Sequence, residues 1–266
     1  MQKRDTIRIK SDKPRGILNL RGPVTGHRRY WPSETLAPFV EHYWLVDWDF
    51  ETPERVETLP HPSVHLVLGR GHSEVVGVMR GRFTRMLKGR DRVVGTKFRP
   101  GGFRAFVDLP VSAYTDRRLP ATAVFGSRAA DLDARALCDD DAESIEVVES
   151  FLRGCHPVAN EDIELCGRMV AKIAQDRDIT RVDQIAEQFA LSMRQLQRLF
   201  SEYVGVTPKW VIQRHRLIEA AERIAAGTME DWAGLALSLG FADQAHFIRG
   251  FKKIVGRTPA EYARQF

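Results

Sequence analysis

A repeated segment near the carboxyl end constrains the fold of this chain more than any other feature of its sequence. Residues 198–208 (RLFSEYVGVTP) and 249–259 (RGFKKIVGRTP) share an Arg, a Phe, a Gly, a Thr and a Pro, and each matching pair lies 51 positions apart. Further upstream the match continues at an offset of 50, so the second copy carries one extra residue in its turn. A repeat in register over about twenty positions predicts two copies of one structural unit.

The first copy has the pattern of two short helices around a tight turn. Apolar residues recur at helical spacing over 182–189 and again at Leu196, Leu199 and Phe200, and Ser192 between them is suited to an N-cap. The other face of the second helix is rich in Arg and Gln, the side chains that distinguish bases in the major groove of DNA. This pattern predicts a helix-turn-helix, whose second helix reads the groove.

The second copy follows the same plan. Gly240 suits the turn because glycine tolerates a positive φ, Asp243 is suited to an N-cap, and Phe247 and Phe251 are expected to face inward. Each copy ends in G-x-T-P, whose Thr and Pro fit the N-cap and the first position of a following helix.

The stretch between the copies, residues 208–227, predicts one continuous helix because it has no internal Gly or Pro. At 1.5 Å per residue, about 18 residues span roughly 27 Å. With the width of a helix-turn-helix added, the two reading helices would lie about one DNA turn apart, roughly 34 Å. The tandem units would then enter successive major grooves on one face of a duplex.

These residues resemble a known family. Residues 160–266 are similar to the DNA-binding domain of the AraC/XylS transcriptional regulators, above all in 240–266 (GFADQAHFIRGFKKIVGRTPAEYARQF) and in the L-S-x-R-x-L-x-R-x-F run from Leu191 to Phe200. The resemblance implies that both reading helices contact bases. The chain departs from the family at Ala190, where Gly is common; if the turn requires a positive φ there, Ala costs about 1 kcal/mol.

Carried over position by position, the resemblance assigns base contacts to eight residues: Arg194, Gln195, Gln197 and Arg198 in the first copy, and Gln244, Ala245, His246 and Arg249 in the second. The expected phosphate contacts, which position a protein without specifying sequence, are Lys209, Lys252 and Lys253. A merely solvated helix face is the alternative for each. Arg216, in the linking helix, matches a family position that we interpret as mainly structural.

The first half of the chain has the pattern of an antiparallel β domain. Runs rich in β-branched and aromatic residues recur about every ten residues and are separated by Gly and Pro. These runs lie at 39–50, 63–68, 74–79, 81–87 and 92–98. Residues 128–153 instead show Ala, Leu and acidic residues at helical spacing, and Gly154 and Pro157 mark a boundary.

The expected fold class is α+β: an N-terminal antiparallel β-rich sandwich or barrel, an acidic helical linker, and an all-α C-terminal domain with two helix-turn-helix units joined by a long helix. The expected domains are a basic lead-in at 1–30, the β-rich domain at 31–125, the linker at 126–157 and the DNA-binding domain at 158–266. The net charge is +9 over residues 1–120, −5 over 121–159 and only +1 over 160–266. The expectation of DNA binding therefore depends on local pattern, not on bulk charge.

The first half also resembles an uncharacterised N-terminal domain attached to AraC-type regulators, in LAPFVEHYWLVDWDF, ETLPHPSVHLVL, GTKFRPGGFRAF and LPVSAYTDRRLP. That resemblance implies a sensor or dimerisation module. The candidate effector contacts are Trp44, Trp48, His61, His65 and Arg99. Core packing of the tryptophans and ordinary turn or polar roles for the others are the alternatives. No Cys or carboxylate cluster accompanies the histidines, so neither a metal site nor a cofactor is predicted.

The sequence lacks the signature motifs of several other classes of protein. Three cysteines without a C-x-x-C pair argue against a disulfide scaffold or a zinc ribbon. No apolar run approaches the roughly 18 residues of a membrane span, and the basic start lacks the apolar stretch of a secretory signal. No G-x-S-x-G, Walker loop or H-E-x-x-H motif is present. We expect a cytoplasmic protein that is not an enzyme and does not bind membranes.

The sequence therefore predicts a transcription regulator, activator or repressor, that binds double-stranded DNA and whose N-terminal domain responds to a small-molecule effector. RNA polymerase and a second copy of the chain, joined through the N-terminal domain, are further candidate partners. The alternative is a ligand-independent DNA-binding protein whose N-terminal domain serves protein interaction or dimerisation. A third reading, an enzyme fused to a DNA-binding domain, is disfavoured by the missing catalytic motifs.

Overall fold

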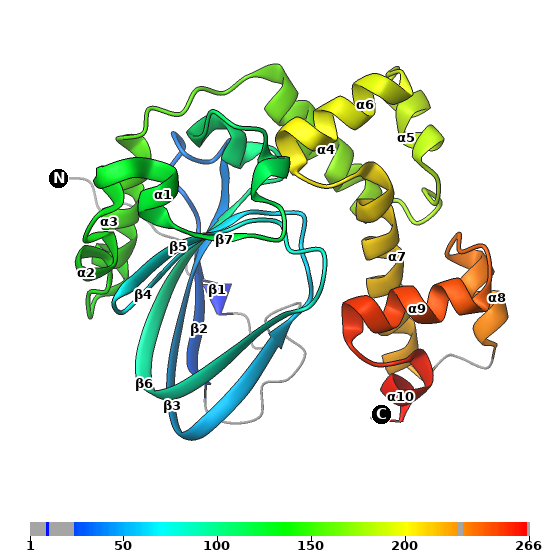
Figure 1. Ribbon diagram of the computed structural model, residues 1–266, viewed down its shortest axis with the longest axis horizontal. Helices are drawn as coiled ribbons and strands as arrows, with labels where there is room; N and C mark the ends of the chain where they lie inside the picture. The colour runs from blue at the N-terminus through cyan, green and yellow to red at the C-terminus, as the bar shows by residue number, and fades with distance from the viewer. Residues whose placement is uncertain (1–8, 11–23, 228–230, 265–266) are drawn as a thin grey trace.

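The computed structural model describes residues 9–10, 24–227 and 231–264, which form a sheet-based N-terminal part and a helical C-terminal part (Figure 1). The predicted basic lead-in, residues 1–30, lies largely outside the described residues. In the view of Figure 1, helices α1 to α3 lie on the left of the strands and the C-terminal helices α4 to α10 lie on the right.

The described strands form one antiparallel sheet with the order β1-β2-β3-β6-β4-β5-β7. Their bounds are β1 Ile9–Lys10, β2 Val24–Tyr30, β3 Val40–Thr58, β4 His65–Gly69, β5 His72–Val76, β6 Phe83–Phe98 and β7 Arg118–Pro120. The predicted antiparallel β-rich domain is confirmed. Its strands make a single sheet with β1 and β7 at the two ends, so the described part of the chain forms neither two stacked sheets nor a closed ring.

Strand β2 is a correction to the expected lead-in, which had placed Val24–Tyr30 in a loose segment. The sequence VTGHRRY offers no apolar run that would mark a strand. Its place depends instead on distant partners: the Arg28 guanidinium pairs with Asp47 at 2.5 Å and with Asp141 at 3.0 Å. The strand then pairs with β3 from Val24↔Trp48 to Tyr30↔Tyr43.

Strands β3 and β6 are longer than predicted. The runs 81–87 and 92–98 belong to one strand, β6, and β3 continues beyond residue 50 to Thr58. The two strands pair from Val40↔Phe98 to Thr58↔Phe83, and the register shifts between Phe50 and Glu54. Pro53 lies within this irregularity, where a residue without an N–H costs no ladder hydrogen bond. The residues that suggested chain breaks are therefore accommodated inside two long strands.

Short helices cover one face of the sheet. They are the 3-10 helices η1 Gly102–Phe106, η2 Val111–Tyr114 and η3 Gly126–Ala129, and the α-helices α1 Ala121–Phe125, α2 Leu132–Ala136 and α3 Asp141–Arg153. The predicted helical segment 128–153 is confirmed, with Asp140 as the N-cap of α3. Glu149 of α3 is buried and accepts hydrogen bonds from the N–H of Ser33 at 2.7 Å and the hydroxyl of Tyr43 at 3.3 Å. The acidic segment is thus packed onto the sheet.

The C-terminal part consists of helices whose bounds agree with the predicted units. They are α4 Glu161–Gln175, α5 Val182–Gln188, α6 Met193–Leu199, the π-helical turn η4 Phe200–Val204, α7 Pro208–Ala225, α8 Trp232–Ser238, α9 Gln244–Val255 and α10 Pro259–Ala263. Helices α5 and α6 form the first helix-turn-helix unit, and α8 and α9 form the second. Thr207 and Thr258 cap α7 and α10, and each is followed by a Pro, as predicted.

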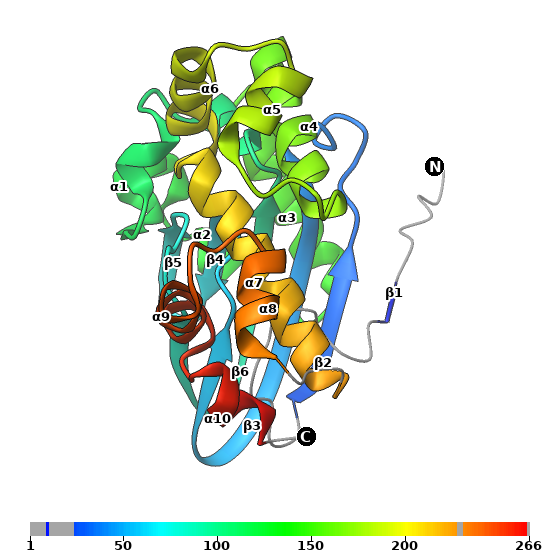
Figure 2. The ribbon, with the colours of Figure 1, turned by 90° about the vertical axis from the view of Figure 1, so that its right-hand side faces the viewer.

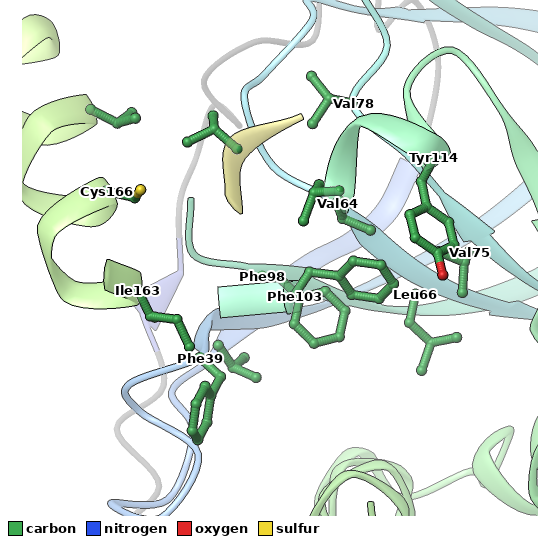
Figure 3. Close-up of a cluster of buried hydrophobic side chains, with 14 of the residues drawn as sticks. Phe39, Val64, Leu66, Val75, Val78, Phe98, Phe103, Tyr114, Ile163 and Cys166 are labelled. Atoms are coloured by element: carbon green, nitrogen blue, oxygen red, sulfur yellow. The ribbon is translucent and has the colours of Figure 1, made fainter. Parts of the chain in front are cut away.

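Two hydrophobic cores hold these helices. The larger core is continuous from Tyr30 in the sheet, through the covering helices and α4 to α6, to Ile212 in α7. Figure 3 shows this continuity, because Ile163 and Cys166 of α4 lie in the same cluster as Phe39, Phe98 and Phe103. The smaller core joins α8, α9 and the second half of α7, with Leu59 of the N-terminal part packed against it. The first unit is therefore packed into the sheet domain, whereas the second has a core of its own.

The turn of each unit has the same backbone conformation. Ala190 and Gly240 both have a positive φ, at 52° and 77°. In each unit, the N–H of the next residue donates to the carbonyl oxygen of the aligned alanine, Leu191 to Ala186 at 2.8 Å and Phe241 to Ala236 at 2.9 Å. This is the hydrogen bonding of a Schellman motif, in which glycine is usual. Ala190 thus holds a backbone conformation that favours glycine.

Replacing Ala190 with glycine is expected to raise the free energy of unfolding by about 1 kcal/mol, because glycine adopts a positive φ without a Cβ penalty. Urea unfolding of the two proteins measures the difference. The reverse change in the other unit, Gly240→Ala, should be destabilising, since a Cβ there would lie 2.6 Å from the Cβ of Thr180. A loss of stability in Ala190→Gly would show that the turn carries no such strain.

Candidate nucleic-acid interface and cavity

Helix α6 presents one polar stripe to solvent. Leu196 and Leu199 are buried, while Arg194, Gln197 and Arg198, at helical spacings of three and four, are exposed. Within the described residues, neither of these two guanidinium groups has a hydrogen bond or an ion pair. The stripe is therefore unoccupied by other parts of the chain and offers ten N–H donors from two arginines.

Gln195 has a different position from its neighbours. Its Oε1 accepts hydrogen bonds from the N–H of Ser192 at 2.9 Å and from the Ser192 hydroxyl at 2.7 Å, while the Ser192 Oγ accepts from the N–H of Gln195. This is a capping box, which fixes the start of α6. The Gln195 amide oxygen is thus occupied, and only its NH₂ group remains for another partner.

Helix α9 presents a second polar stripe. Gln244, Ala245 and Arg249 are exposed, and the helix begins at Asp243, whose carboxylate accepts from the N–H of His246 at 2.6 Å. The His246 ring is half-buried and packs edge-on against Phe241, with ring centroids 5.4 Å apart. Part of the His246 ring is therefore covered by the turn. The exposed polar stripe of α9 consists mainly of the other three side chains.

The second helices of the two units, α6 and α9, lie on the same side of the C-terminal part. Figure 2 shows α6 above α9 along the left edge of these helices, and Figure 1 shows α7 running from one unit to the other. Helix α7 has 18 residues, so its length is about 27 Å at 1.5 Å per residue. Lys209 at the start of α7 and Lys252 and Lys253 near the end of α9 are exposed.

Arg216 is buried in α7 and connects it to α4. Its side chain ion pairs with Glu219 at 2.6 Å and donates to the carbonyl oxygens of Ile173 and Asp176, both at 2.9 Å. These carbonyls lie at the end of α4, where helix geometry leaves them without intrahelical donors. The expectation that Arg216 has a mainly structural role agrees with these contacts.

A cavity of about 290 Å³ lies on the sheet face opposite α1 to α3. Strands β2 to β6 contribute most of the lining, and α7 contributes Arg214. The apolar lining includes Trp44, Val46, Trp48, Val56, Val67, Met79, Phe83, Leu87 and Val93, and the polar lining includes Arg29, His42, His61, Ser63, His65 and Lys97. Four of the five candidate effector residues, Trp44, Trp48, His61 and His65, are therefore brought together around one cavity.

Trp44 forms part of the cavity floor because Gly95 on the neighbouring strand leaves space for it. A Cβ on Gly95 would lie 2.0 Å from the indole ring. The Trp44 Nε1 donates to His65 Nδ1 at 3.3 Å, and the Lys97 Nζ lies 3.1 Å from His61 Nε2 and 2.9 Å from a Glu41 carboxylate oxygen. Hydrogen bonds thus order the polar side chains around this end of the cavity.

The structure does not place Arg99, the fifth candidate, at the cavity. Its Nε donates to the carbonyl oxygen of Ala37 at 2.7 Å, and its N–H donates to that of Phe39 at 2.8 Å. Arg99 is exposed and fixes the turn that follows β6. Four lining cations that the pattern of the sequence did not single out, Arg29, Arg85, Lys97 and Arg214, are present instead. The burial of Arg214 could have been predicted from its spacing, since it lies three residues from both Val211 and Leu217 on the buried face of its helix.

The two capped units, with their polar reading helices on one side, define a helix-turn-helix DNA-binding protein. Residues 185–265 match a helix-turn-helix domain family, and residues 28–120 match a domain of unknown function (DUF6597). The chain belongs to the AraC/XylS family of transcription regulators. The resemblances stated from the sequence are thereby confirmed in both halves of the chain.

Two curated relatives and one solved structure are similar to part of this chain. The probable transcription factor PqrA of Proteus vulgaris is 37% identical over 82 residues, which make up 31% of this chain and 66% of PqrA. The transcriptional activator RhaS of Escherichia fergusonii is 36% identical over 77 residues, 29% of this chain and 27% of RhaS. A solved AraC-type transcriptional regulator from Chromobacterium violaceum is 30% identical, with 40% of this chain and 88% of that one covered and a TM-score of 0.31. The similarity thus spans at most 66% of these two curated relatives.

The names of both curated relatives describe transcription regulators. Among the described helices, none combines the length and the apolar character that crossing a membrane would require.

Proposed function

We propose that the chain regulates transcription by reading an asymmetric DNA site with both helix-turn-helix units, and that its sheet domain responds to a small molecule. The observation that supports the DNA reading best is the pair of exposed polar stripes on α6 and α9, two helices that lie on the same side of the C-terminal part (Figure 2). The stripes differ in sequence, so the two halves of the site should differ.

The proposed base contacts follow the two stripes. Arg194, Arg198 and Arg249 are suited to guanine, and Gln197 and Gln244 to adenine, because these side chains form paired hydrogen bonds with those bases. Ala245 offers a methyl group to thymine. Gln195 and His246 already contact other residues of the chain, so each should contribute less to base reading than its neighbours. Gln195 can still donate from its NH₂ group, and His246 can still donate or accept at its ring edge.

Selection of binding sites from random duplex DNA with the full chain tests this proposal. We expect one asymmetric motif whose two halves are centred about one helical turn, or 10–10.5 base pairs, apart. A motif confined to one major groove would mean that only one unit reads DNA. Absence of any motif, with and without the candidate ligands described below, would contradict sequence-specific binding.

Binding should weaken steeply as salt rises, because each phosphate contact releases counterions from the duplex. Lys209, Lys252 and Lys253 are the proposed phosphate contacts. Lys252→Ala should make the slope of log K against log salt shallower by about 1, while leaving the preferred sequence unchanged. Titrations of the selected duplex at several salt concentrations measure the slope. An unchanged slope would place Lys252 on the solvated surface.

The cavity supports the effector role of the sheet domain. Binding pockets are usually concave, mostly apolar and fitted with a few polar groups that orient the ligand, and this cavity has that composition. The alternative, a sheet domain that acts only as an interaction surface for RNA polymerase or a second copy of the chain, needs no such cavity. A small molecule that raises the melting temperature of the full chain would favour the sensor role.

A further inference from the structure

The cavity has a polar end and an apolar end. His42 and His65 each pair in register with Lys97, so the three residues form one row across β3, β6 and β4. Val93 lies four residues before Lys97 on β6, about 13 Å away at 3.3 Å per residue. Around and beyond Val93 most of the lining is apolar and includes Val46, Trp48, Val56, Phe83 and Leu87. The charged lining residue at this end, Arg85, lies 3.7 Å from the Glu74 carboxylate. A ligand that fits both ends must itself be polar at one end and apolar at the other.

The histidines at the polar end are uncharged near neutral pH. Burial, together with the neighbouring Lys97, lowers the pKa of His65 to about 3 and holds the pKa of His61 well below its ordinary value. Burial also lowers the pKa of His42. The charge of this end is therefore carried by its Lys and Arg side chains, and the neutral rings can serve as hydrogen-bond donors or acceptors.

Arg214 is the feature of this end that most needs a partner. It is 6% exposed, and its guanidinium donates to the carbonyl oxygen of Pro60 and lies 3.3–3.4 Å from the ring nitrogens of His215. Within the described part of the chain, it forms no ion pair with a carboxylate. A buried guanidinium is almost always paired with a negative group, because burial without one is unfavourable. Burial lowers its pKa only to about 10, so the group stays charged.

The lining offers no carboxylate that could take this role. Its carboxylate among the described residues, Glu74, is held by the Arg118 guanidinium at 2.6 and 2.9 Å. Glu41 lies beside Lys97, which it contacts at 2.9 Å. No carboxylate among the described residues therefore pairs with Arg214, and an added negative charge would be stabilised at the polar end.

We propose that the cavity binds an organic carboxylate with an apolar body, and that Arg214 and Lys97 contact its carboxylate group. This inference rests on the sensor role proposed above and adds the chemical class of the effector. With roughly 30 Å³ for each water-sized group, the volume that one water molecule takes up in the liquid, the 290 Å³ cavity holds on the order of ten non-hydrogen atoms. An eight-carbon carboxylate has that size.

The two cations belong to different parts of the protein. Lys97 lies on β6 of the sheet, whereas Arg214 lies on α7, the helix that joins the two DNA-reading units. A carboxylate held by both would connect the sheet domain to that helix. Its binding therefore favours one placement of α7 against the sheet, and affinity for DNA should change by the same factor by which DNA changes affinity for the ligand.

The test uses octanoate, with octan-1-ol and octylamine as neutral and cationic molecules of the same chain length, and the full chain. Octanoate should raise the melting temperature saturably and change the tryptophan fluorescence, since Trp44 and Trp48 line the cavity. The alcohol should have a smaller effect and the amine none. An equal effect of octanoate and octan-1-ol would overturn the assignment of a negative charge, and no effect of octanoate up to its solubility limit would overturn the ligand class.

Variants locate the binding site. Lys97→Met and Arg214→Met should each weaken octanoate binding about tenfold or more, since each removes a charge-assisted hydrogen bond. Arg70→Met removes an exposed charge, 79% exposed and away from the cavity, and should leave binding unchanged. Val56→Phe keeps both cations but fills the apolar end, and it should block octanoate in a protein whose charged groups are intact. Full octanoate binding in both Lys97→Met and Val56→Phe would place the ligand elsewhere.

DNA titrations separate this inference from the proposed function. If octanoate fails to bind while the full chain still selects an asymmetric DNA site, the ligand class is wrong and the DNA reading stands. If octanoate binds but the chain selects no site, the ligand class stands and the DNA reading fails. A change in DNA affinity with octanoate that is lost in Arg214→Met would support the connection through α7.

Discussion

Replacing Arg216 with methionine should lower the free energy of unfolding by about 3–5 kcal/mol. Arg216 is 2% exposed, and its guanidinium satisfies both the buried Glu219 carboxylate and two carbonyl oxygens at the end of α4. Methionine keeps the apolar stem and removes every donor. The buried carboxylate and the two carbonyls would then lose a partner that water cannot easily replace. Urea unfolding followed by circular dichroism measures the loss.

Arg223 provides a matched control, because it contacts the same Glu219 carboxylate at 2.5 Å but is itself 38% exposed. Arg223→Met should cost less than about 1 kcal/mol, as is usual for partly exposed ion pairs. The double variant Arg216→Met with Glu219→Met should recover part of the loss, since it also removes the buried carboxylate that Arg216 neutralised. Equal losses in Arg216→Met and Arg223→Met would contradict the structural role of the buried guanidinium.

The C-terminal half could be predicted in detail because its signals are local. Ser192, Thr207, Asp243 and Thr258 cap helices through side chains that bond to backbone groups only three residues away. The apolar stripes and the spacing of the repeat then determine which face of each helix is buried and which is exposed. The residues proposed as base contacts need only be exposed on the second helix, and sequence spacing is sufficient to predict that exposure.

The N-terminal half depended on distant partners, and its details were predicted less well. Strand β2 is held by pairing with β3 and by the contacts of Arg28 with Asp47 and Asp141, residues that no local pattern connects. Gly89 suggested a break in β6, but the strand continues through it because β3 pairs on both sides, with Phe50 opposite Gly89. The β-propensity of the residues predicts where strands occur, but pairing with the neighbouring strand determines where each strand ends.

The cavity could not be predicted from the sequence for the same reason, because its lining residues are distant in the chain. Trp44, Trp48, His61 and His65 were candidates for their residue types alone, and only the sheet register brings them to one face. Arg214 is separated from them by well over a hundred residues in the chain, and it reaches the cavity because α7 crosses that face of the sheet. A site built from several strands and a helix of the other domain has no sequence motif.

Arg198→Ala should weaken binding to the selected DNA site about 5- to 150-fold, the range for loss of one bidentate contact to a base. The residue lies in the middle of the exposed α6 stripe and has no partner within the described chain. Binding to random duplex should weaken much less, because phosphate contacts dominate there. Titration of each protein with the selected site and with a scrambled duplex of equal length gives both numbers. Arg70→Ala, which removes an exposed charge from the sheet domain, should change neither.

The two units should contribute independently to the reading. Arg249→Ala is expected to relax preference in the other half of the site, and the double variant should lose the product of the two single factors, because residues in separate cores at this distance rarely couple. A duplex mutated in one half distinguishes the units, since each variant should become insensitive to changes only in its own half. If Arg198→Ala weakened specific and scrambled duplexes equally, Arg198 would be a phosphate contact, and the first unit would read DNA through Arg194 and Gln197.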